Sequence, residues 1–477
     1  MVRGCSRIFG VLLALQVFAV LPAAAQNYEF IERRLDENRT GYDVLHVWGS
    51  HYEMGYGMGV ALAEDIVTLW QEVQADYGDL LPLGRSLTER TTWLPAEIED
   101  ELQGIVDGVQ AQIPEADLDV LDLKVLNILS SDLAYYHGCR AHACWGEFVD
   151  APVKLLASRR LDFGTPFPSA GHHLLCAWDP DDGSPRWVNL GWPGMVTVVT
   201  AVNAHGTQVS THDFGSAEMA EGVVPRVVAT RHVLTGMGER PPAEHLQWAQ
   251  GELDAMNVAT SSFLNYFAPA GRAGVFTCGA GGPCGQLRRP QDDYFGGQVI
   301  ITTNSQTDGH QVPGGGQFMH DYYAAGGPKD LDSHFELMGT SGLHLMTVAF
   351  RGPEDMTIRI HGRGAAEPLE IEWSALFSGR PDDGDDGDHG GDDGDGGTDD
   401  GDGDEGDGGT DDGDEGDGGT DDGDDGDDGD GGRDDGDGGT DDDPAGGGKN
   451  GCATGGSGGG LALGWLLLLG LALRRRC

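Results

Sequence analysis

A run of glycine and acidic residues at 381–450 limits what this chain can fold into more than any other feature. Its unit, GDGGTDDGD, begins at Gly394, Gly406 and Gly416, with a variant at Gly436. The unit has almost no apolar side chains, so it cannot bury enough surface to offset the loss of chain entropy. A calcium β-roll is disfavoured because its repeats need a regular apolar position for the interior. We therefore expect a disordered acidic spacer here and one large folded domain at 26–380.

Net charge distinguishes the spacer from the rest of the chain. The spacer holds 32 acidic residues against Arg433 and Lys449, a charge of −30, and the whole chain carries −50, so the other segments sum to −20. The folded part is therefore acidic as well. An acidic domain is poorly suited to the phosphate backbone, so nucleic acid is not an expected partner.

The first 25 residues are predicted to be a secretory signal peptide. Two arginines precede a mostly apolar stretch at 8–21, and residues 23–25 give an A-x-A cleavage pattern just before Gln26. The alternative is a membrane anchor, for which the apolar stretch is short. Export would allow disulfides. Cys278 and Cys284, which flank a glycine-rich loop, are the candidate pair, and two free buried thiols are the alternative.

The C-terminal tail, residues 451–477, has an apolar run at 461–473 followed by three arginines. The arginines are typical of a cytoplasmic stop signal, but the run is short for a permanent anchor. A cysteine before glycine-rich residues, a short span and terminal arginines resemble the sorting tails of myxobacterial exported proteins (MYXO-CTERM type). The resemblance implies processing near Cys452 and display at the cell surface or outer membrane, or secretion. A weak membrane anchor is the alternative.

Hydrophobic spacing divides the folded part into helical and strand-like regions. Helical spacing covers 52–78, 96–113 and 118–136, so the first third is expected to be helical, and it returns at 224–236 and 242–257. Strand-like segments are 153–163, 172–178, 186–191, 195–203, 206–211, 297–303, 343–350 and 356–361. Sheets covered by helices, an α+β fold, account for this order.

The segment that carries chemistry lies where helical spacing gives way to strand spacing, at Gly138-Cys139. Gly138 tolerates strained backbone, and the Cys139 thiol can attack the preceding carbonyl. Hydrolysis of the resulting thioester would free an α-amino group on the nucleophile itself. An amine on the same residue as the thiol can act as its base.

The surroundings of Cys139 resemble a known family. Residues 139–163 (CRAHACWGEF…LLASRRLDFG) are similar to the C-x-x-x-A-x-W-G…R-N-L-D-F pattern of the acyl-coenzyme A:6-aminopenicillanic acid acyltransferase (isopenicillin-N acyltransferase) family, in the N-terminal-nucleophile (Ntn) hydrolase superfamily. Upstream, GSHYEMGYGMG at 49–59 resembles the family's propeptide segment. Asn203 to Gly206 resembles a family N-x-x-G turn, and Thr303-Asn304 resembles the T-N that ends a strand.

The resemblance implies roles residue by residue. Cys139 matches the nucleophile. Asp162 matches the carboxylate that would hold the α-amino group, and Arg159 matches the arginine that would steady both the thiolate and that carboxylate. Asn304 matches an asparagine that helps bind the oxyanion in related cholylglycine hydrolases.

Several residues depart from the family pattern. Arg160 stands where the family has asparagine, and Cys144 where it has alanine. Asp213 falls where related enzymes place an oxyanion asparagine, which leaves the oxyanion region around Asn203 and Asp213 open. A metal cluster of His137, Cys139, His142 and Cys144 matches no common zinc spacing. A Cys139–Cys144 disulfide would silence the enzyme, and a buried core thiol at Cys144 is the simpler interpretation.

The resemblance thus implies a four-layer αββα Ntn-hydrolase fold that cuts itself at Gly138–Cys139. The products would be an α chain, 26–138, and a β chain, 139–380, which stay associated. The mature enzyme would open a small linear amide (N-acyl amino acid, peptide or β-lactam type) through a Cys139 thioester and pass the acyl group to water or an amine. No cofactor or metal is expected. The alternative is a catalytically silent, surface-displayed binding module.

Overall fold

The computed structural model describes residues 26–33, 42–129, 137–163, 171–218, 220–238, 240–290, 295–304 and 317–380. All of these residues belong to one unit of the chain as judged by internal contacts. The predicted signal peptide, acidic spacer and C-terminal tail, with Cys452, lie outside them. Within the described ranges, no helix is both long and apolar enough to cross a membrane.

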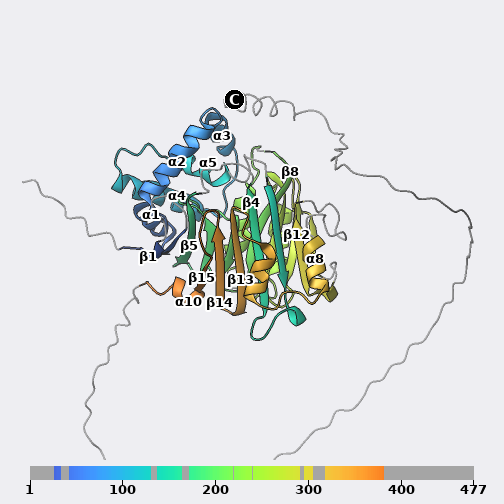
Figure 1. Cartoon of the computed structure of the whole chain (residues 1–477). Coiled ribbons are helices and arrows are strands. Elements are labelled where there is room, and N and C mark those ends of the chain that lie inside the picture. The colour runs from blue at the N-terminus through green and yellow to red at the C-terminus, as the bar shows by residue number, and fades with distance from the viewer. Residues whose placement is uncertain are drawn as a thin grey trace, which may run out of the picture. The chain divides into compact units, whose positions relative to one another are not determined.

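Two β-sheets lie face to face at the centre of the domain (Figure 1). In the described residues the first sheet has nine strands, in the order β1 (Tyr28–Arg33), β2 (Tyr42–Gly49), β5 (His173–Pro180), β6 (Trp187–Gly191), β7 (Thr200–Asn203), β8 (Gln208–Ala217), β9 (Thr260–Phe267), β10 (Ala273–Cys278) and β11 (Gln286–Arg288). The second sheet, counted over the same residues, has six strands, in the order β12 (Val299–Thr303), β3 (His137–Cys144), β4 (Leu155–Phe163), β13 (His344–Gly352), β14 (Asp355–Gly362) and β15 (Leu369–Glu372).

Helices cover the outer side of each sheet. Those associated with the first sheet are α1 (His51–Ala61), α2 (Ala63–Tyr77), α3 (Leu81–Thr88), α4 (Glu97–Gln112), α5 (Val120–Ile128), α6 (Arg226–Thr235) and α7 (His245–Ala255). Those associated with the second sheet are α8 (Gln317–Ala324) and α9 (Leu331–Met338), and a short α10 (Trp373–Leu376) follows β15. The predicted four-layer αββα architecture is confirmed.

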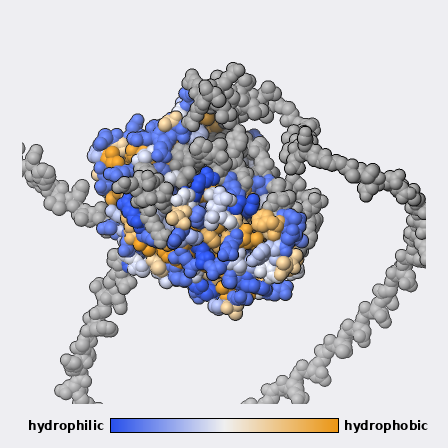
Figure 2. Space-filling model, viewed as in Figure 1, coloured by the Kyte–Doolittle hydropathy of each residue, from blue (hydrophilic) through white to orange (hydrophobic). Residues whose placement is uncertain are grey.

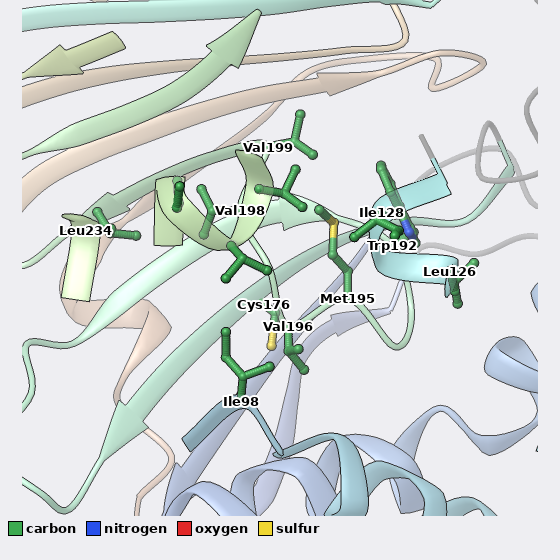
Figure 3. Close-up of a cluster of buried hydrophobic side chains, with 14 of the residues drawn as sticks. Ile98, Leu126, Ile128, Cys176, Trp192, Met195, Val196, Val198, Val199 and Leu234 are labelled. Carbon is green, nitrogen blue, oxygen red and sulfur yellow. The ribbon is translucent and has the colours of Figure 1, made fainter. Parts of the chain in front are cut away.

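Three apolar clusters hold the four layers together. The first fills the space between the first sheet and its helices, and Figure 3 shows part of it, with Ile98 of α4 close to Cys176 of β5 and Leu234 of α6 at the left of the view. The second lies between the two sheets and the third under α8 and α9. The visible surface in Figure 2 is mostly hydrophilic, with small separate hydrophobic patches. Because the second cluster lies on one side of the second sheet and the third cluster on the other, alternate residues of β3 and β4 face either the first sheet or α8 and α9.

Glycines bring α1 and α4 unusually close together. A Cβ added at Gly55 or Gly59 of α1 would lie 2.1 Å from the carbonyl oxygen of Glu101 or 2.4 Å from that of Ile105. On α4, a Cβ at Gly104 would lie 2.3 Å from the carbonyl oxygen of Tyr52. The glycines of the 49–59 motif thus lie mainly inside a helix, where they permit close helix packing.

The prediction that the first third is helical is wrong in part. Tyr28–Arg33 and Tyr42–Gly49 are strands. Every residue of β2 is buried, so it lacks the polar alternation that marks a half-exposed strand. The predicted helix at 52–78 is two helices that meet at Leu62. Strands β9 to β11 were not predicted either.

Candidate active site

Cys139 lies near the start of β3, on the face that looks toward the first sheet. Strand pairing places Gly138 opposite Asp162 and Cys139 opposite Leu161 of β4. Cys139 is 3% exposed. The predicted nucleophile therefore lies near the start of an internal strand, between β12 and β4.

Arg159 of β4 reaches the Cys139 thiol from the neighbouring strand. Its Nη2 lies 3.4 Å from Cys139 Sγ and donates to the Thr211 carbonyl oxygen at 2.9 Å. Its Nη1 donates to Thr200 Oγ1 and to His344 Nε2, both at 3.0 Å. The guanidinium is fully buried. A cation held this close to a thiol in a buried site favours the thiolate.

Asn304, just after β12, contacts the backbone of the same cysteine. The N–H of Cys139 donates to Asn304 Oδ1 at 2.7 Å. The sequence predicted an oxyanion role, in which the side-chain N–H₂ of Asn304 would donate. In the uncut chain its carbonyl oxygen instead accepts from the nitrogen of the nucleophile residue.

Asp162 does not pair with Arg159 as the resemblance implied. Its carboxylate is bound by Arg160, with Nε to Oδ1 at 2.7 Å and Nη2 to Oδ2 at 3.0 Å, and Arg140 lies 4.0 Å away. The cause is strand geometry, since residues three apart in β4 point to opposite faces. Arg160, which stands where the family has asparagine, forms the ion pair with this carboxylate instead.

The predicted oxyanion region divides between a turn and a strand. Asn203 Oδ1 accepts from the backbone N–H groups of His205 and Thr207, each at 3.1 Å, and its Nδ2 donates to the Leu234 carbonyl oxygen at 3.0 Å. These contacts give Asn203 a structural role in the β7–β8 turn. The backbone of Asp213 pairs with Ser262 in β9, and the position of its side chain lies outside the description.

Three groups that hold Arg159 are not among the residues predicted from the sequence. Thr200 and Thr211 come from β7 and β8 of the first sheet, and His344 from β13 of the second. His344 is 1% exposed, and burial, with the charges of Arg159 and His173, holds its pKa well below the usual value. The sequence signal was weak, since His344 lies in the predicted strand segment 343–350 but nothing in the sequence pairs that segment with β4.

Cys144 lies on the opposite face of β3, in the apolar cluster under α8 and α9. Its Sγ donates to the Phe148 carbonyl oxygen at 3.5 Å, and burial raises the pKa of this thiol to about 12. On the same face, His142 Nδ1 lies 2.7 Å from the Tyr323 hydroxyl, and burial lowers the pKa of His142 to about 3. This face holds groups that stay neutral.

The cysteines of the described residues have distinct states. Cys139, Cys144 and Cys176 are free thiols, so no disulfide joins Cys139 to Cys144. Cys278 and Cys284 form a disulfide. In the part of the chain that the structure describes, no three His, Cys, Asp or Glu side chains are grouped to hold a metal ion.

Comparisons with known proteins give distant similarities. No family model matches the chain. An uncharacterized protein of Archaeoglobus fulgidus is 26% identical over 252 residues, which cover 46% of this chain and 39% of that protein, so the chain spans well under half of its length. The solved Caenorhabditis elegans ortholog of N-acylethanolamine-hydrolyzing acid amidase has a TM-score of 0.32 and 10% identity, covering 44% of this chain and 92% of that one. Penicillin V acylase from Agrobacterium tumefaciens has a TM-score of 0.34 and 11% identity, covering 49% and 86%.

Proposed function

We propose that the chain is a self-cleaving cysteine amide hydrolase or acyltransferase of the Ntn type, with Cys139 as nucleophile. The observation that supports this most strongly is the pair of contacts at one residue. A buried guanidinium lies 3.4 Å from Cys139 Sγ, and an amide oxygen accepts from Cys139 N at 2.7 Å. The first contact activates a thiol, and the second holds the nitrogen that cleavage would release.

The first step is cleavage of the chain. The Cys139 thiol loses its proton and attacks the Gly138 carbonyl carbon, the Gly138–Cys139 peptide bond breaks, and a thioester forms while the Cys139 nitrogen takes up the proton that the thiol has lost. Water then hydrolyses the thioester and leaves a carboxylate on Gly138 and a free thiol on Cys139. The new α-amine, with a pKa of about 7.7–8.0 in model peptides, can serve as a base near neutral pH.

The second step is turnover of a small linear amide. The Cys139 thiol gives its proton to the α-amine and attacks the substrate carbonyl, and the leaving amine takes that proton away. The acyl group remains on Sγ as a thioester. Water releases it as an acid, or an amine as a new amide. Arg159 stabilises the negative charge on the sulfur once the proton has moved to the α-amine, and Asn304 orients that amine.

Contacts across the cut support association of the two products. Strand β2, from before the cut, pairs in parallel with β5 along its whole length. Glu101 of α4 accepts from both Nη atoms of Arg231 in α6, and this guanidinium, despite burial, lowers the pKa of the carboxyl. His51 of α1 joins them, with Nδ1 2.7 Å from Glu101 Oε1 and Nε2 3.1 Å from Asp182 Oδ2. Such buried charges cost several kcal/mol to separate.

A denaturing gel with N-terminal sequencing tests the proposal. Wild type should give two fragments, and the second should begin at Cys139. Cys139→Ala should give one uncut band, while Cys144→Ala, the matched control on the same strand, should be cut like wild type. An intact chain in wild type, or a cut elsewhere, would contradict the proposal.

One observation favours a silent binding module instead. Arg160 binds both oxygens of Asp162, the carboxylate assigned to the α-amine. A silent module would give the same uncut band from wild type and Cys139→Ala. Arg160→Asn separates the two possibilities further, because freeing Asp162 to hold the α-amine should raise turnover of a small amide by an enzyme and should have no effect on a silent module.

We also propose export, on the sequence alone. The support is the signal-like segment at 1–25 and the tail at 451–477. The chain should be found at the cell surface or outer membrane, or secreted. Cell fractionation with and without the last 27 residues tests this. Loss of surface retention without the tail is expected, and full-length protein that stays in the cytoplasm would refute export.

A further inference from the structure

Four adjacent strands of the second sheet supply a row of side chains at one end. In order, β12 leads into Asn304, β3 carries Cys139, β4 carries Arg159 and β13 carries His344. His344 pairs with Leu161, two residues from Arg159 on the same face of β4. Diagonal neighbours on adjacent strands are within reach of long side chains. His344 and Asn304 are therefore the two outer members of this row, with Cys139 and Arg159 between them.

The hydrogen bonds of Arg159 account for all four N–H groups of its two Nη atoms. The two N–H groups of Nη1 donate to Thr200 Oγ1 and His344 Nε2. The two N–H groups of Nη2 donate to the Thr211 carbonyl oxygen and to Cys139 Sγ. A guanidinium is planar, so partners at one end fix the direction of the other end. The orientation of Nη2 toward sulfur thus depends on what Nη1 is bound to.

The chemistry of the contact fixes the tautomer of His344. Arginine has donors and no acceptor, so Nε2 must present a lone pair and the ring proton must lie on Nδ1. The pKa of His344, lowered by burial and by the neighbouring Arg159 and His173, agrees with a neutral ring. With its lone pair on Arg159, Nε2 is not available to take a proton from Cys139. His344 can therefore act on the thiol only through the guanidinium.

We propose that His344 is a positioning residue, which holds the Arg159 guanidinium so that Nη2 faces the Cys139 sulfur. The inference rests on the proposed function, because it assigns regulation of that same thiol. Thr200 shares the role, with its hydroxyl 3.0 Å from Nη1 and 3.3 Å from His344 Nε2. Without these acceptors Nη1 would seek other partners, the plane would turn, and the thiolate would lose its cation.

The test measures the pH dependence of Cys139 alkylation by iodoacetamide, read by peptide mass spectrometry. His344→Leu should slow alkylation at pH 7 by about tenfold or more and move the rate profile toward higher pH, since loss of a close opposite charge shifts a titration by about one unit or more. His344→Gln should recover most of the reactivity, because its side-chain oxygen can accept at a similar reach. His361→Leu, on the adjacent strand, is the matched control and should behave as wild type.

Thr200→Val keeps the test decisive where His344→Leu fails to fold, since it removes one acceptor with little change of volume. It should shift the profile in the same direction by a smaller amount. A folded His344→Leu or Thr200→Val with the wild-type profile would overturn the inference. Wild-type Cys139 that resists iodoacetamide at pH 7 would instead contradict the proposed function, so the two failures are distinguishable.

Discussion

Cys139 and Cys144 belong to one strand and differ mainly in what faces them. Both thiols are buried. Cys139 points toward the first sheet, where Arg159 Nη2 lies 3.4 Å from its sulfur. Cys144 points toward α8 and α9, where burial raises the pKa of its thiol to about 12. Burial alone therefore makes a thiol inert, and a fixed cation is what makes a buried thiol a candidate nucleophile.

The same contrast separates the histidines of the two faces. His344 accepts from the cation beside Cys139, whereas His142 and His334 stack at 3.9 Å behind the strand. Burial keeps all three neutral by lowering their pKa values. Neutral imidazoles thus lie on both faces of the second sheet, and of these three histidines only His344, on the inner face, accepts from a charged group.

The largest expected effect comes from removing the cation. Arg159→Met should lower alkylation of Cys139 at pH 7 by about 10- to 1,000-fold. An opposite charge within about 4–6 Å lowers the pKa of an acidic group by about one to three. Chain cleavage should slow in parallel. Iodoacetamide labelling and the denaturing gel measure both.

Cys144 is the internal control for that variant. It should stay unlabelled while the domain is folded, so its labelling would report that Arg159→Met has opened the structure. Equal reactivity of Cys139 in wild type and in a folded Arg159→Met variant would show that the Arg159 cation does not activate this thiol.

A smaller effect should follow from changes at Asn304. If its oxygen holds the Cys139 nitrogen, Asn304→Asp keeps an acceptor and should cleave within about tenfold of wild type. Asn304→Leu removes it and should slow cleavage by about 10- to 100-fold, the cost of a buried donor left without a partner. The cleavage time course on a gel measures the two rates.

The outcome decides between two roles of Asn304. A side-chain N–H₂ that stabilises an oxyanion would be lost in both variants, and the carboxylate would add repulsion. An aspartate variant slower than the leucine variant would therefore support the oxyanion role and contradict the acceptor role.

Local features of the site could be predicted, and contacts between distant strands could not. The change from helical to strand spacing located Gly138-Cys139, and the motif selected Arg159. The separation of Arg159 from Asp162 was also readable, because residues three apart in a strand face opposite ways. The family motif treats Arg159 and Asp162 as one functional pair, and this led to the prediction of a contact that strand geometry disfavours.

The partners of Arg159 show where a single sequence stops being informative. Thr200, Thr211 and His344 lie far from Arg159 in sequence, and the pairing of β13 with β4 brings His344 beside it. Strand order is set by packing over the whole domain rather than by local spacing. The same reason explains β2, whose residues are buried throughout because a sheet neighbour lies on each side and other layers cover both faces.

The smallest expected effect concerns the inert thiol and alkaline stability. The folded pKa of Cys144, about 12, exceeds its usual value of 9.0, so the folded state favours the protonated thiol. That contribution to stability is fully present below pH 9 and is lost as pH rises from 9 toward 12. Cys144→Ala should therefore lose less stability than wild type over this range, after a cost at pH 7 of about 1–2 kcal/mol for the lost packing. Thermal melts of both proteins from pH 7 to 11 measure the difference, and parallel curves would mean that the outer face of β3 already admits water to this sulfur.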